Sequence, residues 1–234
     1  MKNVSKLMMM MIALITIMAS CKKSNNDVVE PNAPVTTSDL LNQYITLQAS
    51  VTPSLRILYF TKDGNDVKAT VDAVTSRRAQ TVTLADNSFT FDTDGDGKKV
   101  YTFTFSKDGS GKLSMNSYTY KNSDVPEATA VYAQLNSITD AQDPKSKHFA
   151  GLDHTNYMMN FTDLSTWQVS DQRGNDTSYP SYYLVSPGAW KGTRPDGTAY
   201  MGVSVPKWNG TNQPVVLVQS SAANSTIEVY KQAN

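Results

Sequence analysis

Apolar and polar residues alternate along most of the chain after residue 54, which is the pattern of β-strands that bury one face. The clearest run is Val100–Phe105, in which aromatic residues alternate with threonines. About a dozen such runs, spaced by about 8–15 residues, predict an all-β fold: an antiparallel sandwich or a barrel, of which a lipocalin-like barrel is one form. The predicted strands are Leu55–Phe60, Val67–Val74, Gln80–Leu84, Ser88–Phe91, Val100–Phe105, Lys112–Tyr120, Ala128–Leu135, Tyr157–Phe161, Trp167–Ser170, Tyr179–Val185, Tyr200–Val205, Val215–Val218 and Thr226–Tyr230.

Two segments depart from this pattern. Thr37, Ser38 and Asp39 are residues that favour helix N-termini, and an apolar series from Leu40 to Leu47 follows them. This predicts one short N-terminal helix that ends before Pro53. Residues 136–155 are polar and aperiodic, so we expect an irregular connection there.

The two halves of the β region share residues at an offset of about 100 positions, which suggests two copies of one unit. Turn residues such as Asp-Gly also recur by chance, so coincidence is the alternative. The two copies would cover 38–135 and 150–234, either as separate small domains or as parts of one barrel. The recurring residues are Phe60-Thr61 with Phe161-Thr162, Leu84 with Leu184, Asp96-Gly97 with Asp196-Gly197, Lys107 with Lys207, and Val131-Tyr132 with Val229-Tyr230.

The start of the chain has the layout of a secretory signal peptide. Lys2 and Lys6 precede an apolar run that is too short to span a bilayer. The run ends in Ile17-Met18-Ala19-Ser20-Cys21, and Cys21 is the only cysteine of the chain. This ending resembles the lipobox of bacterial lipoproteins, although Met18 stands where Leu, Val or Ile is usual. The resemblance implies cleavage after residue 20 and lipidation of Cys21.

Residues 21–37 then form a lipidated cysteine and a polar, proline-containing tether, and 38–234 form the β domain. Lys22 follows the cysteine, where enteric lipoproteins that stay at the inner membrane carry Asp. By this resemblance we expect an outer-membrane lipoprotein, facing either the periplasm or the outside. The formal net charge of +0 gives no basic face for nucleic acid, so the expected membrane partner is reached through the lipid.

One loop resembles a metal site. Asp92, Asp94 and Asp96 stand in a D-x-D-x-D-G pattern, the start of a calcium loop. The twelfth position is Phe103 instead of a bidentate Glu, and two lysines follow the acids. A hairpin turn between two alternating strands is therefore the favoured interpretation, with calcium as the alternative.

Aromatic residues concentrate in the second half and offer a candidate ligand site. All three tryptophans lie there, and two of them are flanked by Gly and Pro, which places them on loops or strand ends. Such rings could stack on a sugar or line a pocket mouth, while core packing is the more common use. The candidate ligand-binding residues are Trp167, Trp190, Trp208, Tyr182, Tyr183 and Tyr200.

Catalytic motifs are absent from the sequence. The two histidines, His148 and His154, lie with Asp153 in the irregular stretch and fit no zinc spacing. There is no Gly-x-Ser-x-Gly elbow and no glycine-rich phosphate loop. We therefore expect a lipid-anchored envelope protein that binds a glycan, a small apolar molecule or another envelope protein, without a cofactor. The alternatives are a hydrolase with an unrecognised site and an assembly subunit without a small ligand.

Overall fold

The structure is a computed structural model, and it describes residues 33–50, 54–152, 158–162, 165–171, 174–175 and 181–233. Within these residues the chain forms 18 strands and two short 3-10 helices, so the predicted all-β class is confirmed. Every pairing between strands is antiparallel. In this part of the chain, no helix has the length and apolar character needed to cross a membrane.

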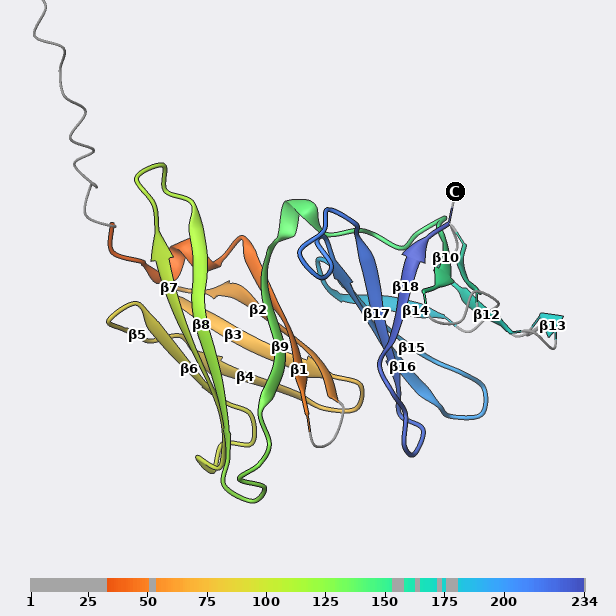
Figure 1. Cartoon of the computed structure of the whole chain (residues 1–234), viewed down its shortest axis with the longest axis horizontal. Coiled ribbons are helices and arrows are strands. Elements are labelled where there is room, and N and C mark those ends of the chain that lie inside the picture. Colours follow the sequence, from red (N-terminus) through yellow and green to blue (C-terminus); the bar gives the residue numbers. More distant parts are fainter. Residues whose placement is uncertain are drawn as a thin grey trace, which may run out of the picture. The chain divides into compact units, whose positions relative to one another are not determined.

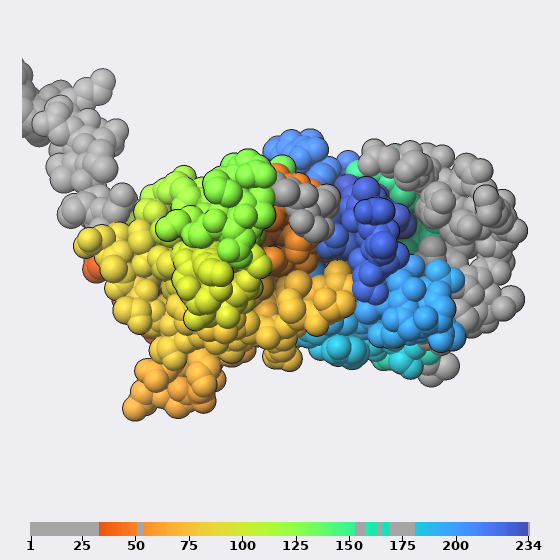
Figure 2. Space-filling model, turned by 90° about the horizontal axis from the view of Figure 1, so that it is seen from below, coloured from red at the N-terminus to blue at the C-terminus, as the bar shows by residue number. Residues whose placement is uncertain are grey.

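The first half forms two sheets, drawn from orange to green in Figure 1. One sheet has the order β4-β3-β2-β1-β9 and the other β5-β6-β7-β8. The turn between β2 and β3 is exposed and protrudes from the surface as an orange lobe in Figure 2. The elements are η1 (Thr37–Leu40), β1 (Gln43–Ala49), β2 (Ser54–Asp63), β3 (Asp66–Ala73), β4 (Arg77–Thr81), β5 (Leu84–Ala85), β6 (Ser88–Asp92), β7 (Lys99–Lys107), β8 (Leu113–Asn122) and β9 (Ala130–Ser137).

Apolar side chains at alternate strand positions fill the space between these two sheets. Along β7, Tyr101, Phe103 and Phe105 are buried and their neighbours are less so, as the sequence pattern predicted. Their rings pack in a row with centroids 5.9 Å and 6.5 Å apart. Apolar residues of β1, β2, β3 and β6 complete this first core.

The second half forms a single sheet of nine strands in the order β13-β12-β11-β10-β18-β17-β16-β15-β14. The backbone N–H of Tyr182 donates to the carbonyl of Ser165 at 2.9 Å, and Thr166 bridges to Ser181. These contacts join β12 to β14, so eight strands form a nearly closed barrel. The elements are η2 (Ile138–Asp140), β10 (His148–Gly151), β11 (Met158–Phe161), β12 (Trp167–Asp171), β13 (Gly174–Asn175), β14 (Tyr182–Ser186), β15 (Ala189–Thr193), β16 (Ala199–Val205), β17 (Val215–Ser220) and β18 (Glu228–Gln232).

Both halves have the same strand order. Adding nine to each strand number of the first half reproduces the pairings of the second, except that β8 and β9 are not hydrogen-bonded neighbours whereas β17 and β18 are. The residues that recur in the sequence fall on equivalent elements: Phe60 on β2 and Phe161 on β11, for example. Two copies of one unit would give this arrangement, and their common origin stays a prediction.

A separate apolar cluster joins the two halves, and we call it the seam. The alternate face of β2, with Leu55, Ile57 and Tyr59, packs there against residues of β16 and β17. Tyr44 Oη donates to the carbonyl of Ser204 at 2.9 Å across the seam. The chain from Ala33 onward is accordingly one compact unit.

A buried ion pair also crosses the seam. Lys191 Nζ on β15 lies 2.9 Å from Asp72 Oδ1 on β3, and the Asp72 side chain is only 1% exposed. Tyr59 Oη donates to the other carboxylate oxygen at 3.1 Å, and Arg77 donates to Tyr59 Oη at 2.7 Å. Burial, followed by the negative charge of Asp72, raises the pKa of Tyr59 to about 12. Each polar group in this network therefore has a partner, which a buried charge requires.

The structure corrects three local expectations. The predicted N-terminal helix is only the 3-10 turn η1, and Tyr44, Ile45 and Leu47 lie in strand β1 instead. β1 pairs with β2 and β9 and is buried on both faces, so its apolar run lacks the alternation that marks half-buried strands. The segment expected to be irregular contains strand β10, and the Gly-flanked Trp190 lies on strand β15 rather than on a loop.

Candidate functional site

A polar cleft of about 530 Å³ opens at one edge of the seam. Its walls come from five stretches: η1 with the residues after it, the turn between β7 and β8, the end of β9, η2, and the residues that follow β16. Most of the lining side chains are amides, hydroxyls or charged groups. They are Ser38, Asp39, Asn42, Gln43, Gly111, Lys112, Leu113, Gln134, Leu135, Asn136, Ser137, Asp140, Pro206 and Lys207.

The carboxylate of Asp39 lies in the wall of the cleft and is held there by hydrogen bonds to neighbouring residues. Its Oδ2 accepts hydrogen bonds from the backbone N–H of Thr36 at 2.8 Å and from Lys107 Nζ at 2.9 Å. Burial alone would raise the pKa of Asp39, but the hydrogen bonds of Lys107 and Thr36 outweigh it and hold that pKa below its usual value. Asp39 is therefore ionised and neutralised by Lys107, so it does not add a free charge to the cleft.

Three other charged groups face the cleft without a partner. Among the residues that the structure describes, Lys112, Lys207 and Asp140 take part in none of the ion pairs. All three are exposed. Two cations and one anion are thus available to a ligand, and each keeps its hydration until a ligand replaces it.

A row of polar side chains on one face of β9 forms the floor. Tyr132 Oη donates to Gln134 Oε1, and Gln134 Nε2 donates to Asn136 Oδ1 at 2.7 Å. Asn136 Nδ2 in turn donates to Thr46 Oγ1 on β1 at 3.1 Å. These hydrogen bonds determine the orientation of the oxygen and the nitrogen in each of the two side-chain amides, Gln134 and Asn136. The floor is consequently preorganised.

Trp208 is the one predicted aromatic residue beside this cleft. It follows the lining residue Lys207 on the loop after β16, is partly buried, and its ring lies 5.5 Å from that of Tyr132. The indole therefore packs against the end of the polar row.

Most of the other predicted aromatics meet inside the barrel that the second half forms. Trp167 and Trp190 are 1% and 2% exposed, and Tyr182 is 6% exposed. The two indole rings lie 5.2 Å apart, and the Tyr200 ring lies 5.0 Å from that of Trp167. The structure thus brings four of the six candidates together, but as core packing rather than as a surface for a sugar. Tyr183 points away from this group and is 61% exposed.

Two glycines make room for these indoles. Gly202 on β16 pairs with Trp190 on β15, and a Cβ atom at Gly202 would lie 2.1 Å from Trp190 Nε1. A Cβ atom at Gly192 would lie 2.5 Å from Trp167 Nε1. Both indole N–H groups are buried without a hydrogen-bond partner. Each of these indole nitrogens therefore lies in close contact with glycine backbone instead of with a hydrogen-bond acceptor.

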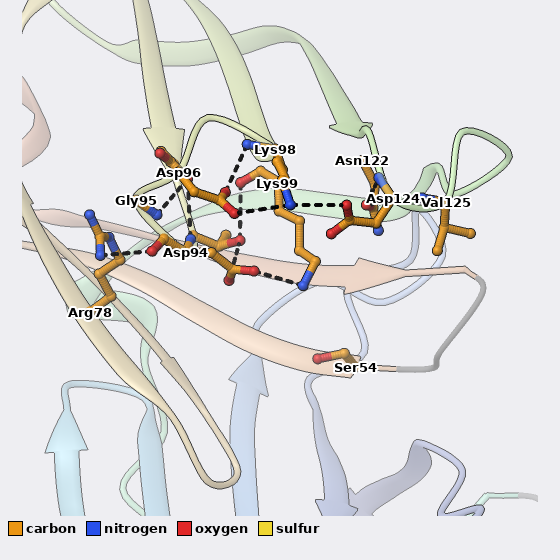
Figure 3. Close-up of polar contacts among 12 residues, drawn as sticks. Ser54, Arg78, Asp94, Gly95, Asp96, Lys98, Lys99, Asn122, Asp124 and Val125 are labelled. Carbon is orange, nitrogen blue, oxygen red and sulfur yellow. Dashed lines mark hydrogen bonds and ion pairs between the residues drawn. The ribbon is translucent and has the colours of Figure 1, made fainter.

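The aspartate loop forms the turn of the hairpin between β6 and β7, so the hairpin interpretation is confirmed. The Asp92 carboxylate accepts backbone N–H bonds from Gly95 and Gly97, each at 2.8 Å. In Figure 3, Asp94 points to Lys99 and Asp96 to Lys98, and the Asp94–Lys99 pair measures 2.7 Å. In the described part of the chain, no three acidic, His or Cys side chains are grouped so as to hold a metal ion.

The remaining candidates are scattered or lie outside the described residues. His148 is exposed on β10, where its Nδ1 lies 2.8 Å from Asn160 Oδ1. Asp153, His154 and Cys21 fall outside the residues that the structure describes. Among the described residues, His148 is not part of a group of three His, Cys or acidic side chains that could hold a metal ion.

Sequence reasoning did not find the cleft, because its walls come from segments that are far apart in the chain. The one local signal is on β9, where Tyr132, Gln134 and Asn136 place polar groups on the face opposite to Ala133 and Leu135. Such a polar face is also what a solvated strand shows, so the pattern alone does not distinguish the two cases.

Comparison with known proteins adds little to this geometry. No protein-family model matches the chain, and no curated protein matches it. Among solved structures, the chain is similar to a protein of unknown function of the DUF3598 family from Nostoc punctiforme, with 9% sequence identity over 86% of this chain and 100% of that one. The TM-score is 0.23, which is too low for that likeness to bear on fold or function.

Proposed function

We propose that this protein is a lipid-anchored binding protein of the cell envelope that does not catalyse a reaction. The anchor is proposed from Cys21 and the lipobox-like residues before it, and the tether from the polar residues that follow. Under this proposal the lipid holds the protein at the outer membrane, and the β domain carries the binding site.

The seam cleft is the observation that supports binding. Its floor of hydrogen-bonded amides and its unpaired Lys112, Lys207 and Asp140 offer donors and acceptors at fixed positions. Leu113, Leu135 and Pro206 are the main apolar residues among the lining, so the cleft suits a hydroxyl-rich ligand better than an apolar one. We therefore propose a glycan segment as the ligand.

The lining also explains why we propose binding rather than hydrolysis. The lining includes Ser38 and Ser137, but no histidine that could act as a base for either one. Asp39 is occupied by Lys107, which leaves Asp140 as the lining carboxylate without a partner. A glycosidase requires two carboxyl groups at a set separation.

Calorimetric titration with cell-envelope oligosaccharides tests the ligand. Lys207→Gln and Gln134→Ala are each expected to weaken binding by about 3–10-fold, the effect of one lost hydrogen bond. Lys62→Gln removes an equally exposed lysine from the distant turn of β2 and β3, and serves as the matched control. Equal binding by Lys207→Gln, Gln134→Ala and Lys62→Gln would contradict the cleft as the site, and product release from any oligosaccharide would contradict a non-catalytic role.

The anchor is tested separately. Mass spectrometry of the protein from membranes is expected to show an acylated N-terminal Cys21, and Cys21→Ser is expected to move the protein to the soluble fraction. An unmodified cysteine would refute the anchor and leave the cleft proposal intact.

A further inference from the structure

Arg56 places a positive charge at the end of the first core. It lies on β2, where Leu55 and Ile57 face the seam while Leu58 and Phe60 face the first core. Alternation puts Arg56 on the same face as Leu58, and its Cζ lies 5.9 Å from the centroid of the Tyr101 ring, which belongs to that core. The guanidinium therefore enters the first half and not the seam.

The guanidinium is left with unused donors. Its Nε donates to Ser54 Oγ at 3.2 Å, but its Nη1 is buried and has no hydrogen-bond partner. Arg56 also takes part in none of the ion pairs between described residues. By contrast, Arg77 contacts Asp72 and Tyr59, and Arg78 donates to the carbonyl of Asp94.

A second unused donor lies beside it. The Tyr101 side chain is 0% exposed, and its hydroxyl is buried without a partner. Its ring stacks on that of Tyr120 with the centroids 4.4 Å apart. Burial raises the pKa of Tyr101 to about 12 although the positive charge of Arg56 acts in the opposite sense, so the hydroxyl is a neutral donor.

Asp94, on which the charge of Arg56 acts, does not form an ion pair with the guanidinium. Asp94 feels the charge of Arg56, but its carboxylate pairs with Lys99 at 2.7 Å. Figure 3 shows this carboxylate turned toward Lys99, with Ser54 on β2 below it. A buried guanidinium nitrogen and a buried hydroxyl that both lack a hydrogen-bond acceptor are costly unless an acceptor arrives from outside.

We propose that Arg56 and Tyr101 form a binding site for a single oxyanion group, a carboxylate or a phosphate. Both donors lack an acceptor, and a planar guanidinium matches the two oxygens of such a group. Arg56 as a whole is partly exposed, so the residue is not fully shielded from solvent. The flanking rings of Tyr101 and Tyr120 favour an organic carboxylate over a hydrated inorganic ion. This site is distinct from the seam cleft and goes beyond the proposed function.

Calorimetry and thermal melting with sodium acetate, benzoate and inorganic phosphate test this site, with sodium chloride keeping the ionic strength constant. The wild-type protein is expected to bind at least one probe at millimolar concentration and to melt at a higher temperature in its presence. Tighter binding of benzoate than of phosphate would identify an organic carboxylate, and the reverse would identify a phosphate group. Binding should also perturb the tyrosine absorbance through Tyr101.

Variants assign the binding to these two residues. Arg56→Gln is expected to weaken it by about tenfold or more, and Tyr101→Phe by about 2–10-fold, since one loses charged hydrogen bonds and the other a neutral one. Arg56→Lys keeps the charge but loses the planar fork, and it covers the case in which Arg56→Gln does not fold. Arg78→Gln removes a nearby charge and should leave binding within about twofold.

Two results would overturn the proposal. One is the absence of binding of every probe to the folded wild-type protein. The other is binding that both Arg56 variants leave unchanged. Lys207→Gln, which tests the seam cleft, should not alter oxyanion binding, so failure of one proposal is distinguishable from failure of the other.

Discussion

The close packing of Trp190 over Gly202 gives the sharpest test of how the core of the barrel in the second half is packed. Gly202→Ala adds one methyl group, whose carbon would lie 2.1 Å from Trp190 Nε1, 2.3 Å from Cε2 and 2.6 Å from Cζ2. The indole cannot simply withdraw, because the rings of Phe161 and Trp167 lie 5.0 Å and 5.2 Å away on its other sides. The substitution therefore forces the packed aromatic group to shift.

The expected cost follows from overpacking a buried site. Inserting a methyl group into a well-packed core lowers the free energy of unfolding by about 1–3 kcal/mol. The better strand propensity of Ala than of Gly offsets about 0.5–1 kcal/mol of this cost, so we expect a net loss of about 1 kcal/mol. For a chain of this size that corresponds to a fall in Tm of about 2–4 °C.

Thermal and urea unfolding, followed by tryptophan fluorescence, measure this loss. The control is Trp190→Leu, which removes the clashing ring. In that background Gly202→Ala should be neutral or should stabilise by up to about 1 kcal/mol, so the pair should be non-additive. A Tm of Gly202→Ala within about 1 °C of the wild type would refute the packing argument. An equal cost of Gly202→Ala with and without Trp190 would refute it as well.

Three further predictions concern the polar groups. Asp72→Asn leaves the buried Lys191 ammonium without its counter-ion and should lower the free energy of unfolding by about 3 kcal/mol or more in urea titrations, whereas an unchanged midpoint would show that the pair is dispensable. The pKa of Asp39 is lowered in the folded state, so its contribution to stability is present above the unfolded value near 3.9 and is lost as the pH falls through the folded pKa. Asp39→Asn should therefore destabilise by about 1 kcal/mol at pH 7 and by progressively less as the pH falls below about 4, measured as the difference from wild type across pH. Millimolar calcium should leave the Tm unchanged, because Asp92 binds its own backbone and Asp94 binds Lys99; a calcium-dependent rise that Asp92→Ala abolishes would contradict this.

Local sequence patterns predicted the all-β class, and the strands that they missed have physical causes. Alternation placed β7 correctly because one of its faces is buried and the other is not. The same rule missed β1, which is buried on both faces, and β15, whose Gly192 leaves room for the indole of Trp167. In each case a contact from a distant segment decided a structure that local propensity would not choose.

The sequence by itself determined the β class, the turns and the repeating order of aromatic and polar positions, because these follow from short-range alternation and turn chemistry. Only the tertiary structure decided what those residues do. It buried Trp167 and Trp190 in a barrel, turned Asp92 toward its own backbone, and left Arg56 Nη1 buried without a hydrogen-bond partner. The cleft and the Arg56 site both depend on which strands pair and which faces meet, and that is a property of long-range packing that no single segment carries.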